Sequence, residues 1–230
     1  MNEIQIEVWG DFACFSRPES KVERLTYPVI TPSAARGILS AVYSKPIEFY
    51  WQIKRIEVLS PIKYISFKRN EVINSKINPR SPKSILVEDT KKTGAEHQHR
   101  TQRQSVVLKD VRYRITAQII KQPEFSGNTQ QLYEQAIRRI KTGKCFYQPS
   151  FGLREFVCYF GEPTDAAPIS DSLDIGIMLY DVFDLHKYEL SETAESYITL
   201  FRARMEHGVI DVPDFDSELV LKPEGGDNDA

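Results

Sequence analysis

The sequence has few cysteines, few histidines and no long hydrophobic run, and each shortage excludes a class of protein. The three cysteines, Cys14, Cys145 and Cys158, form neither a CxxC pair nor a Cys/His metal-binding spacing. We therefore expect ordinary reduced thiols, with no metal and no other cofactor. No stretch approaches membrane-spanning length, and the first residues, MNEIQIEVWGDF, lack the basic and apolar segments of a signal peptide. These absences predict a cytoplasmic protein without a membrane partner.

Charge is nearly balanced overall but is distributed unevenly along the chain. The net charge is −2, yet residues 51–144 hold 20 Lys/Arg against 8 Asp/Glu, whereas residues 145–230 hold 5 against 18. A centre this basic is typical of a surface that binds phosphate, provided that the fold gathers the charges on one face. The alternative is that the acidic C-terminal part neutralises them inside the fold.

Apolar periodicity predicts alternating strands and helices in the first half of the chain. Ile4, Ile6 and Val8 alternate with polar residues, which is typical of a half-buried strand. Thr31 and Pro32 have the residue types of an N-cap and a first helical position, so a helix is expected from there to Lys45-Pro46. Two strand-like runs, IKRIEVLS and IKYISFKRN, follow.

Residues 70–104 are polar, basic and too long for an ordinary connection, so we interpret them as a functional hairpin or loop. The next run, SVVLKDVRYRITAQII, alternates as a strand, with Arg112 and Arg114 on the face opposite its apolar residues. A second helix is expected over 128–141, since Asn128 and Gln131 have capping-box spacing and Gly143 supplies a stop. REFVCYF and DIGIMLYDVFD are further predicted strands.

This order of elements predicts an α+β protein with a ferredoxin-like, RRM-type unit followed by extra strands. Several long segments then resemble, in order from Gly10 to Pro213, the type I-C subfamily of the CRISPR-associated Cas-five proteins, which are RAMP-fold members of the Cascade surveillance complex. They are GDFACFSRPESKVERLTYPVITPSAARGILSAVYSKP, IKRIEVLSPIKYISFKRNEV, RTQRQSVVLKDVRYRI, RRIKTGKCFYQPSFGLREF, DIGIMLYDVFD and MEHGVIDVP.

The resemblance implies three parts and a tail. Residues 1–160 would form the RRM-like domain with a basic hairpin or thumb at about 70–104, residues 161–222 a small antiparallel domain, and residues 223–230 a disordered tail. It also implies a role in antiviral defence, in which the protein cuts CRISPR repeat RNA without metal. It would then hold the 5′ handle of the guide RNA beside the backbone and large subunits of Cascade.

Proteins of this family are similar in placing a Tyr or His just after the first helix and a Lys-His pair at the start of the second. Tyr43 matches the first position as the catalytic candidate. The pair falls on Gln131 and Leu132, so neither the cation nor the imidazole is present. Since a phenol with a pKa near ~10 is a poor base at neutral pH, the sequence leaves cleavage open while it supports RNA binding.

Three explanations remain open for the missing pair. The chain has lost cleavage, or His97 and His99 in the basic stretch replace the missing groups, or the helix register differs and Tyr43 with Lys45 suffices. The same residues also have plain structural interpretations: Tyr43 packs under the helix end and the histidines are exposed loop residues.

For RNA contact we single out six cations, whose guanidinium and ammonium groups suit phosphate contacts. They are Lys21, Arg24, Arg69, Arg100, Arg103 and Arg138. The alternative for each is a solvated charged surface. The alternative function is a non-catalytic subunit whose basic centre docks an acidic protein, and a metal-dependent nuclease is disfavoured because no carboxylate cluster is evident.

Overall fold

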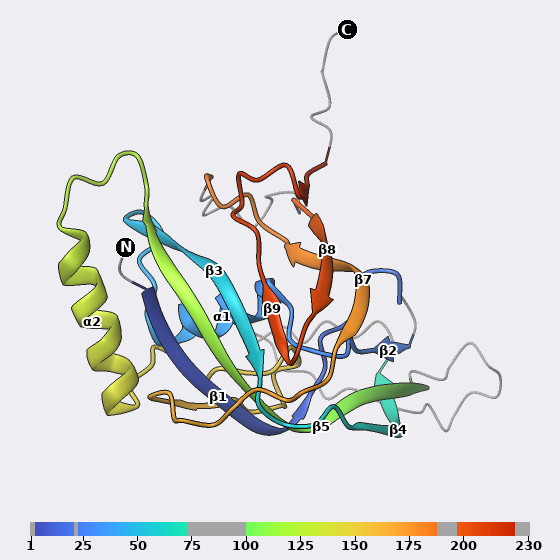
Figure 1. Cartoon of the computed structure of the whole chain (residues 1–230). Helices are drawn as coiled ribbons and strands as arrows, with labels where there is room; N and C mark the ends of the chain where they lie inside the picture. The colour runs from blue at the N-terminus through green and yellow to red at the C-terminus, as the bar shows by residue number, and fades with distance from the viewer. Residues whose placement is uncertain (1–2, 21–22, 73–99, 188–196, 224–230) are drawn as a thin grey trace, which may run out of the picture.

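The computed structural model describes residues 3–20, 23–72, 100–187 and 197–223 (Figure 1). It is a mixed α+β fold with few helices and largely antiparallel sheets, as the sequence predicts at this level. The elements run in the order β1 (Glu3–Ala13), β2 (Arg24–Leu25), α1 (Pro32–Val42), β3 (Phe49–Val58), β4 (Tyr64–Val72), β5 (Arg100–Lys121), α2 (Thr129–Thr142), β6 (Tyr159–Gly161), β7 (Leu173–Asp181), β8 (Thr199–Met205), β9 (Val209–Asp211) and β10 (Val220–Leu221).

The larger sheet is built around β5. Its strands follow the order β6-β1-β5-β3-β9, and β2 and β4 also pair with β5. The predicted alternation is confirmed, because Ile6 of β1 lies opposite Ile115 of β5 and both side chains are buried. The helices α1 and α2 pack against this sheet and against each other.

Both helices begin and end where the sequence predicts. Thr31 accepts a hydrogen bond from the backbone N–H of Ala34 at 3.2 Å, and Pro32 is the first residue of α1. At α2, Gly143 closes the helix in the left-handed conformation at φ 65°. The predicted capping box between Asn128 and Gln131 is wrong in detail, since Asn128 accepts its hydrogen bond from the backbone N–H of Gln130, at 2.9 Å.

The second sheet has the order β10-β8-β7 and shares one continuous hydrophobic core with the first. A bidentate ion pair joins it to α1: Arg36 donates from Nε and Nη2 to the carboxylate of Asp181, the latter at 2.9 Å. The strand β9 leaves this C-terminal region and pairs with β3 in the first sheet. The predicted strand REFVCYF is shorter in the structure, where the strand β6 covers Tyr159–Gly161 and Val157 forms an isolated bridge with Ser150.

Strands β4 and β5 form a long antiparallel arm at one end of the molecule (Figure 1). Tyr64 lies opposite Leu108 and Val72 opposite Arg100, so the predicted basic excursion begins and ends in a paired ladder. Its central residues, 73–99, lie outside the described part of the chain. Between the arm and the rest of β5, Asp110 has φ 54°, in the left-handed region.

Cys14 and Cys158 are buried, Cys145 is partly buried, and none forms a disulfide in the described residues. Neither described helix, at 11 and 14 residues, has the length and apolar character needed to cross a bilayer. The predicted tail falls mostly on residues 224–230, which are not described.

Candidate nucleic-acid interface

Tyr43 is the C-cap residue of α1, and its ring is buried with 3% of its surface exposed. Its carbonyl accepts a hydrogen bond from the indole N–H of Trp51 at 2.8 Å, and its ring packs on Phe49 at 5.5 Å. The packing role that the sequence allowed for Tyr43 is therefore present. A chemical role depends on what lies beside the ring.

Two residues beside Tyr43 were missed by the sequence interpretation. The Arg139 guanidinium lies 4.1 Å from the ring centroid of Phe146 and 5.7 Å from that of Tyr43. The two rings are stacked at 6.5 Å with an interplanar angle of 21°. A signal was present in the sequence, namely the adjacent aromatic residues Phe146 and Tyr147 just after the helix-ending Gly143.

Burial raises the pKa of the Tyr43 phenol above its ordinary value, and the nearby charge of Lys45 only partly offsets that effect. The phenol is therefore fully protonated at neutral pH. It can donate a hydrogen bond, but less of the phenolate form that could act as a general base is present at neutral pH than for a free tyrosine.

The two positions that carry the Lys-His pair in the family lie on another turn of α2. Gln131 is exposed and Leu132 is buried in the core. Arg139, which contacts Tyr43, is two turns further along the helix, about 12 Å at 1.5 Å per residue. Leu132 therefore serves as an apolar core residue.

Three of the arginines proposed for RNA contact gather where β2, β4 and β5 meet. Arg24 of β2 pairs in register with Ser105 of β5, and Arg69 of β4 lies directly opposite Arg103. Arg24 and Arg69 both lower the pKa of the buried Cys14 thiol, although burial raises it more strongly. The fold thus brings together residues that are up to 79 positions apart in the sequence.

Arg69 is the best defined member of this group. Its guanidinium lies 4.7 Å from the ring centroid of Phe67 and 5.5 Å from that of Phe156, and it forms an ion pair with Glu155. The aromatic rings hold the cation in place, while the carboxylate offsets part of its charge.

The remaining candidates are dispersed or not described. Arg138 is exposed on α2, where it donates to Gln135, and Arg100 opens β5 opposite Val72. Lys21, His97 and His99 lie outside the described residues.

Part of the basic centre is neutralised by the acidic C-terminal region, as the alternative interpretation of the charge pattern predicted. Lys54 forms an ion pair with Asp214, and Arg55 donates to Asp211 at 3.0 Å. The described cations therefore form a group of three arginines at the arm and further single cations elsewhere.

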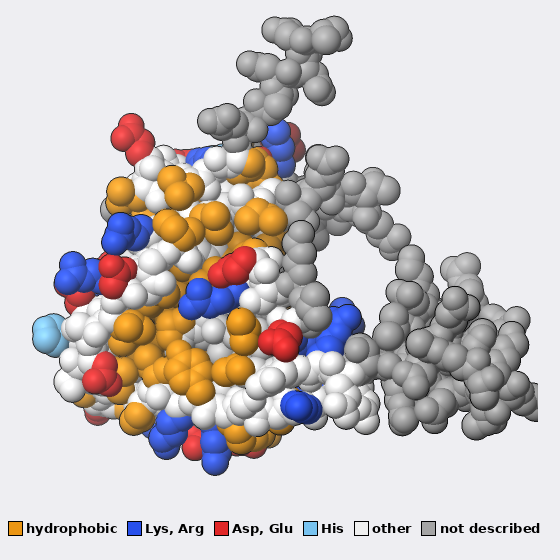
Figure 2. All heavy atoms as spheres, turned by 90° about the vertical axis from the view of Figure 1, so that its right-hand side faces the viewer, with side chains coloured by type: hydrophobic (Ala, Val, Ile, Leu, Met, Phe, Trp, Pro, Cys, Tyr) orange, Lys and Arg blue, Asp and Glu red, His pale blue; other side chains and the backbone are white. Residues whose placement is uncertain are grey.

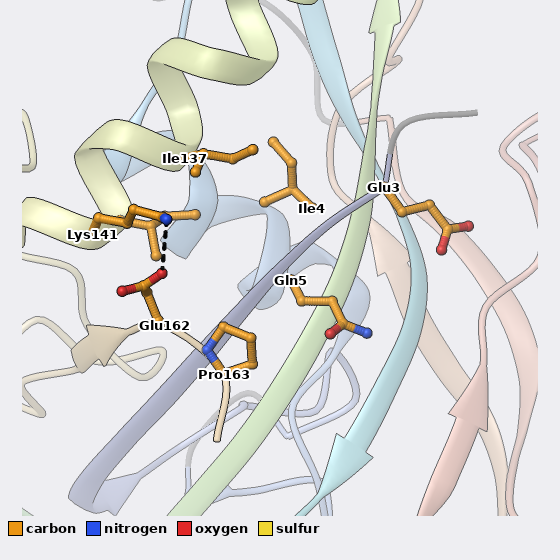
Figure 3. Close-up of a pocket in the computed structure, with 8 residues that line it drawn as sticks. Glu3, Ile4, Gln5, Ile137, Lys141, Glu162 and Pro163 are labelled. Carbon is orange, nitrogen blue, oxygen red and sulfur yellow. Dashed lines mark ion pairs between the residues drawn. The ribbon is translucent and has the colours of Figure 1, made fainter. Parts of the chain in front are cut away.

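The pockets and faces of the molecule add no second catalytic site among the described residues. A groove of about 410 Å³ between α2 and β1 is lined by Ile137, Lys141 and Glu162, the last two ion-paired at 3.4 Å (Figure 3). The side of the molecule on the right of Figure 1 shows hydrophobic side chains gathered in its middle (Figure 2). Ile177 of β7 and Phe183 in the turn after it are exposed. No group of three or more His, Cys, Asp or Glu in the described ranges is placed to hold a metal ion.

Comparison with known proteins gives the family. A family model described as CRISPR-associated protein (Cas_Cas5), of the Cas5d type, matches residues 3–213. The chain belongs to this family. The type I-C resemblance noted in the sequence is thereby confirmed.

Two curated relatives of this Cas5 chain carry the name CRISPR pre-crRNA endoribonuclease Cas5d. The one from Mannheimia succiniciproducens is 40% identical over 236 residues, covering 96% of this chain and 99% of the relative. The one from Thermus thermophilus is 39% identical over 225 residues, covering 93% and 92%.

Solved structures support the same fold. A crystal structure titled as a CRISPR-associated protein superposes with a TM-score of 0.64, at 18% identity over 95% of this chain and 96% of the other. A functionally uncharacterized protein from Streptococcus mutans gives a TM-score of 0.61 at the same identity and coverage.

Proposed function

We propose that this Cas5 chain binds CRISPR repeat RNA and holds the repeat-derived 5′ handle of the guide RNA, as a subunit of a type I-C-like Cascade complex in the cytoplasm. The observation that carries the proposal is the match, over nearly the full chain, to two relatives named pre-crRNA endoribonuclease. The arginines at the base of the β4–β5 arm supply cations where a phosphate backbone would lie.

The proposal includes a ferredoxin-like unit within residues 1–160, with a small antiparallel domain over 161–222. Its support is the succession β1-α1-β3-β5-α2-β6, whose strands have the spatial order β6-β1-β5-β3. In this arrangement the β4–β5 arm is an extension of the unit that carries Arg69 and Arg103 opposite each other.

The described groups around Tyr43 favour holding RNA over cutting it. Cleavage without metal needs a base for the ribose 2′-hydroxyl and an acid for the leaving 5′-oxygen. The Tyr43 phenol is protonated and buried, so it suits donation to RNA better than proton removal. Arg139 supplies a cation in the same cluster, which is the group that would face a phosphate.

A second candidate function is metal-independent cleavage of the repeat transcript, favoured by the names of both curated relatives. Because Gln131 and Leu132 cannot replace a Lys-His pair, this function would draw its missing groups from residues 73–99, where His97 and His99 lie. Tyr43 would then act as the acid.

One experiment separates these functions. Purified full-length protein is incubated with labelled cognate repeat RNA in EDTA, and both retardation and cleavage are recorded. Retardation without a cut supports the holding function. A discrete cut with a 2′,3′-cyclic phosphate end that Tyr43→Phe abolishes supports the second function, and failure to retard the RNA contradicts both.

The cation group at the arm has its own measurement, the dependence of RNA affinity on potassium chloride. Replacing Arg24, Arg69 and Arg103 together by Ala should weaken binding and reduce the log–log salt slope by about 0.7 per lost phosphate contact. A matched control replaces Arg202 and Arg204, which are exposed on β8 of the second sheet, and should leave the slope unchanged. Equal slopes in both variants would reject the arm as the RNA contact, and a steep loss for the control alone would move the contact to the second sheet.

A further inference from the structure

Phe146 is a large aromatic side chain that the structure leaves uncovered although its surroundings are ordered. Its side chain is 55% exposed, and the neighbouring Tyr147 is 61% exposed. Exposed aromatic side chains lose the favourable transfer of apolar surface out of water, so a ring held in this state at a binding surface points to a ligand that covers it.

Two hydrogen bonds hold the backbone of Phe146 and the guanidinium beside its ring, and neither uses the exposed surface of the ring. The backbone N–H of Phe146 donates to the carbonyl of Ala41 at 2.8 Å, which ties the loop after α2 to the end of α1. The Arg139 guanidinium that lies on the ring donates from Nη1 to the carbonyl of Val42 at 3.1 Å. The ring is therefore positioned before any ligand arrives.

Arg139 lies against the Phe146 ring. Its guanidinium is 4.1 Å from the ring centroid, and its buried Nε–H group has no hydrogen-bond partner within the described structure. An unpaired buried donor on a cation costs free energy, so the other contacts of Arg139 outweigh that cost. The Tyr43 ring also stacks on Phe146, with the centroids 6.5 Å apart, so a ligand would cover the part of the Phe146 surface that stays exposed.

The surroundings favour a nucleic-acid base as the ligand. Two lysines flank the aromatic pair in the sequence, and both are exposed. Lys144 precedes Phe146 by two residues, and Lys45 follows Tyr43 by two residues and forms an ion pair with Glu48 at 2.8 Å. Unstacked bases bind to aromatic faces, and phosphates bind to the cations beside them. A peptide aromatic ring would use the same face but would not require the flanking cations.

We propose that Phe146, backed by Arg139, is a stacking site for one unpaired base of the repeat RNA beside Tyr43. Neither the family match nor the names of the relatives assigns such a site to this chain. The inference rests on the proposed function, because it names where one base of that RNA lies.

The test uses full-length protein and a series of repeat RNAs, each with a single 2-aminopurine, whose fluorescence reports stacking. The wild type should quench one position of the series. Phe146→Ala should lose that quenching and bind the RNA about 5- to 150-fold more weakly, the range expected for one stacked base. Phe146→Trp should keep both properties, since it retains an aromatic face.

The matched control is Ile47→Ala, which shortens an apolar side chain that is 70% exposed just beyond Tyr43. It should leave affinity and quenching unchanged. Because stacking releases no counterions, the loss in Phe146→Ala should have the same factor at every salt concentration, unlike the loss from the arm arginines.

The outcomes are distinguishable. If the wild type binds RNA and Phe146→Ala binds equally well, with quenching retained, the stacking site is wrong and the proposed function stands. If the loss in Phe146→Ala is also seen in Phe146→Trp, the ring acts through shape and not through stacking, and the inference fails. If the wild type does not bind repeat RNA, the proposed function fails and the stacking site fails with it.

Discussion

Glu7 shows how a single buried charge is accommodated on the sheet. Its side chain is 1% exposed, yet its carboxylate accepts hydrogen bonds from the backbone and hydroxyl of Thr164, at 3.0 and 2.8 Å, and from Arg112 at 2.6 Å. Burial alone would raise the pKa of Glu7, but these donors outweigh it and hold the pKa below the ordinary 4.5. The ionised form is therefore the one that the fold stabilises.

This depressed pKa predicts a defined pH dependence. A carboxylate whose pKa is lowered on folding stabilises the protein fully above its unfolded pKa and loses that contribution as the pH falls through the folded pKa. We expect Glu7→Gln to lower the free energy of unfolding by about 1–3 kcal/mol at pH 7. The difference from the wild type should shrink below pH 4.5, as urea unfolding at several pH values would show.

The control for Glu7 lies on the same strand. Glu3 is exposed at the start of β1, so Glu3→Gln should change stability little at any pH. A Glu7→Gln deficit that stays constant from neutral to acidic pH would show that the lost acceptor geometry, and not the charge, accounts for it.

At the scale of single elements, two glycines of the helices lie in different backbone conformations. Gly143 ends α2 with a φ of 65°, where a side chain strains the backbone, while Gly37 lies inside α1. An added Cβ would meet no atom within 4 Å at either position. A substitution by alanine at either glycine therefore changes stability through the backbone conformation and not through side-chain packing.

Alanine should act in opposite directions at these two sites. Gly143→Ala should destabilise the protein by about 1 kcal/mol because of the left-handed backbone, and Gly143→Asn by less. Gly37→Ala should stabilise it by about 0.5–1 kcal/mol, since glycine weakens a helix interior. Thermal and urea unfolding of the three variants measure this, and stabilisation by Gly143→Ala would contradict the assigned cap.

The same elements show which features could be predicted from the sequence. Thr31-Pro32, Asn128 and Gly143 carry local chemistry, and the alternation around Ile6 and Ile115 carries the two central strands. The three-residue strand β9 has no such signal, since its pairing with β3 depends on a contact between residues about 150 positions apart. The candidate site likewise contains residues that could be predicted from the sequence and contacts that could not.

Tyr43 was found through its place after α1, but its contacts with Arg139 and Phe146 arise only when the end of α1 meets the loop after α2. The arginine group was anticipated as a set of cations, whereas its assembly from three strands was not visible in the sequence. The partial neutralisation by Asp211 and Asp214 could be expected from charge counts, but the pairing partners could not.

At the scale of the whole molecule, one ion pair connects the two sheets through α1. Asp181 is 1% exposed, accepts from Arg36, and also accepts from the backbone N–H groups of Val182 and Phe183 at 2.7 and 3.1 Å. The Arg36 guanidinium in turn lies 5.2 Å from the Phe183 ring centroid. Removing Arg36 leaves the buried Asp181 carboxylate without its cation, whereas removing Asp181 leaves an arginine whose side chain is 17% exposed.

Arg36→Met should therefore destabilise the protein by about 3–5 kcal/mol, and Asp181→Ala by less, because the remaining Arg36 is partly exposed. The double variant should be less destabilised than the sum of the two single changes, because it removes both charges and leaves no unpaired one. A double-mutant cycle in urea measures the coupling. Additive losses would show that α1 and the second sheet are held together mainly by their apolar contacts.

Strand β5 reaches from the centre of the larger sheet into the arm without interruption, turning at Asp110. At roughly 3.3 Å per residue its 22 residues span about 70 Å. The arm and the centre of the larger sheet are thus parts of one continuous strand, which bends at a single residue in the left-handed conformation. A change in the backbone conformation of Asp110 would therefore alter the angle between the arm and the central strand.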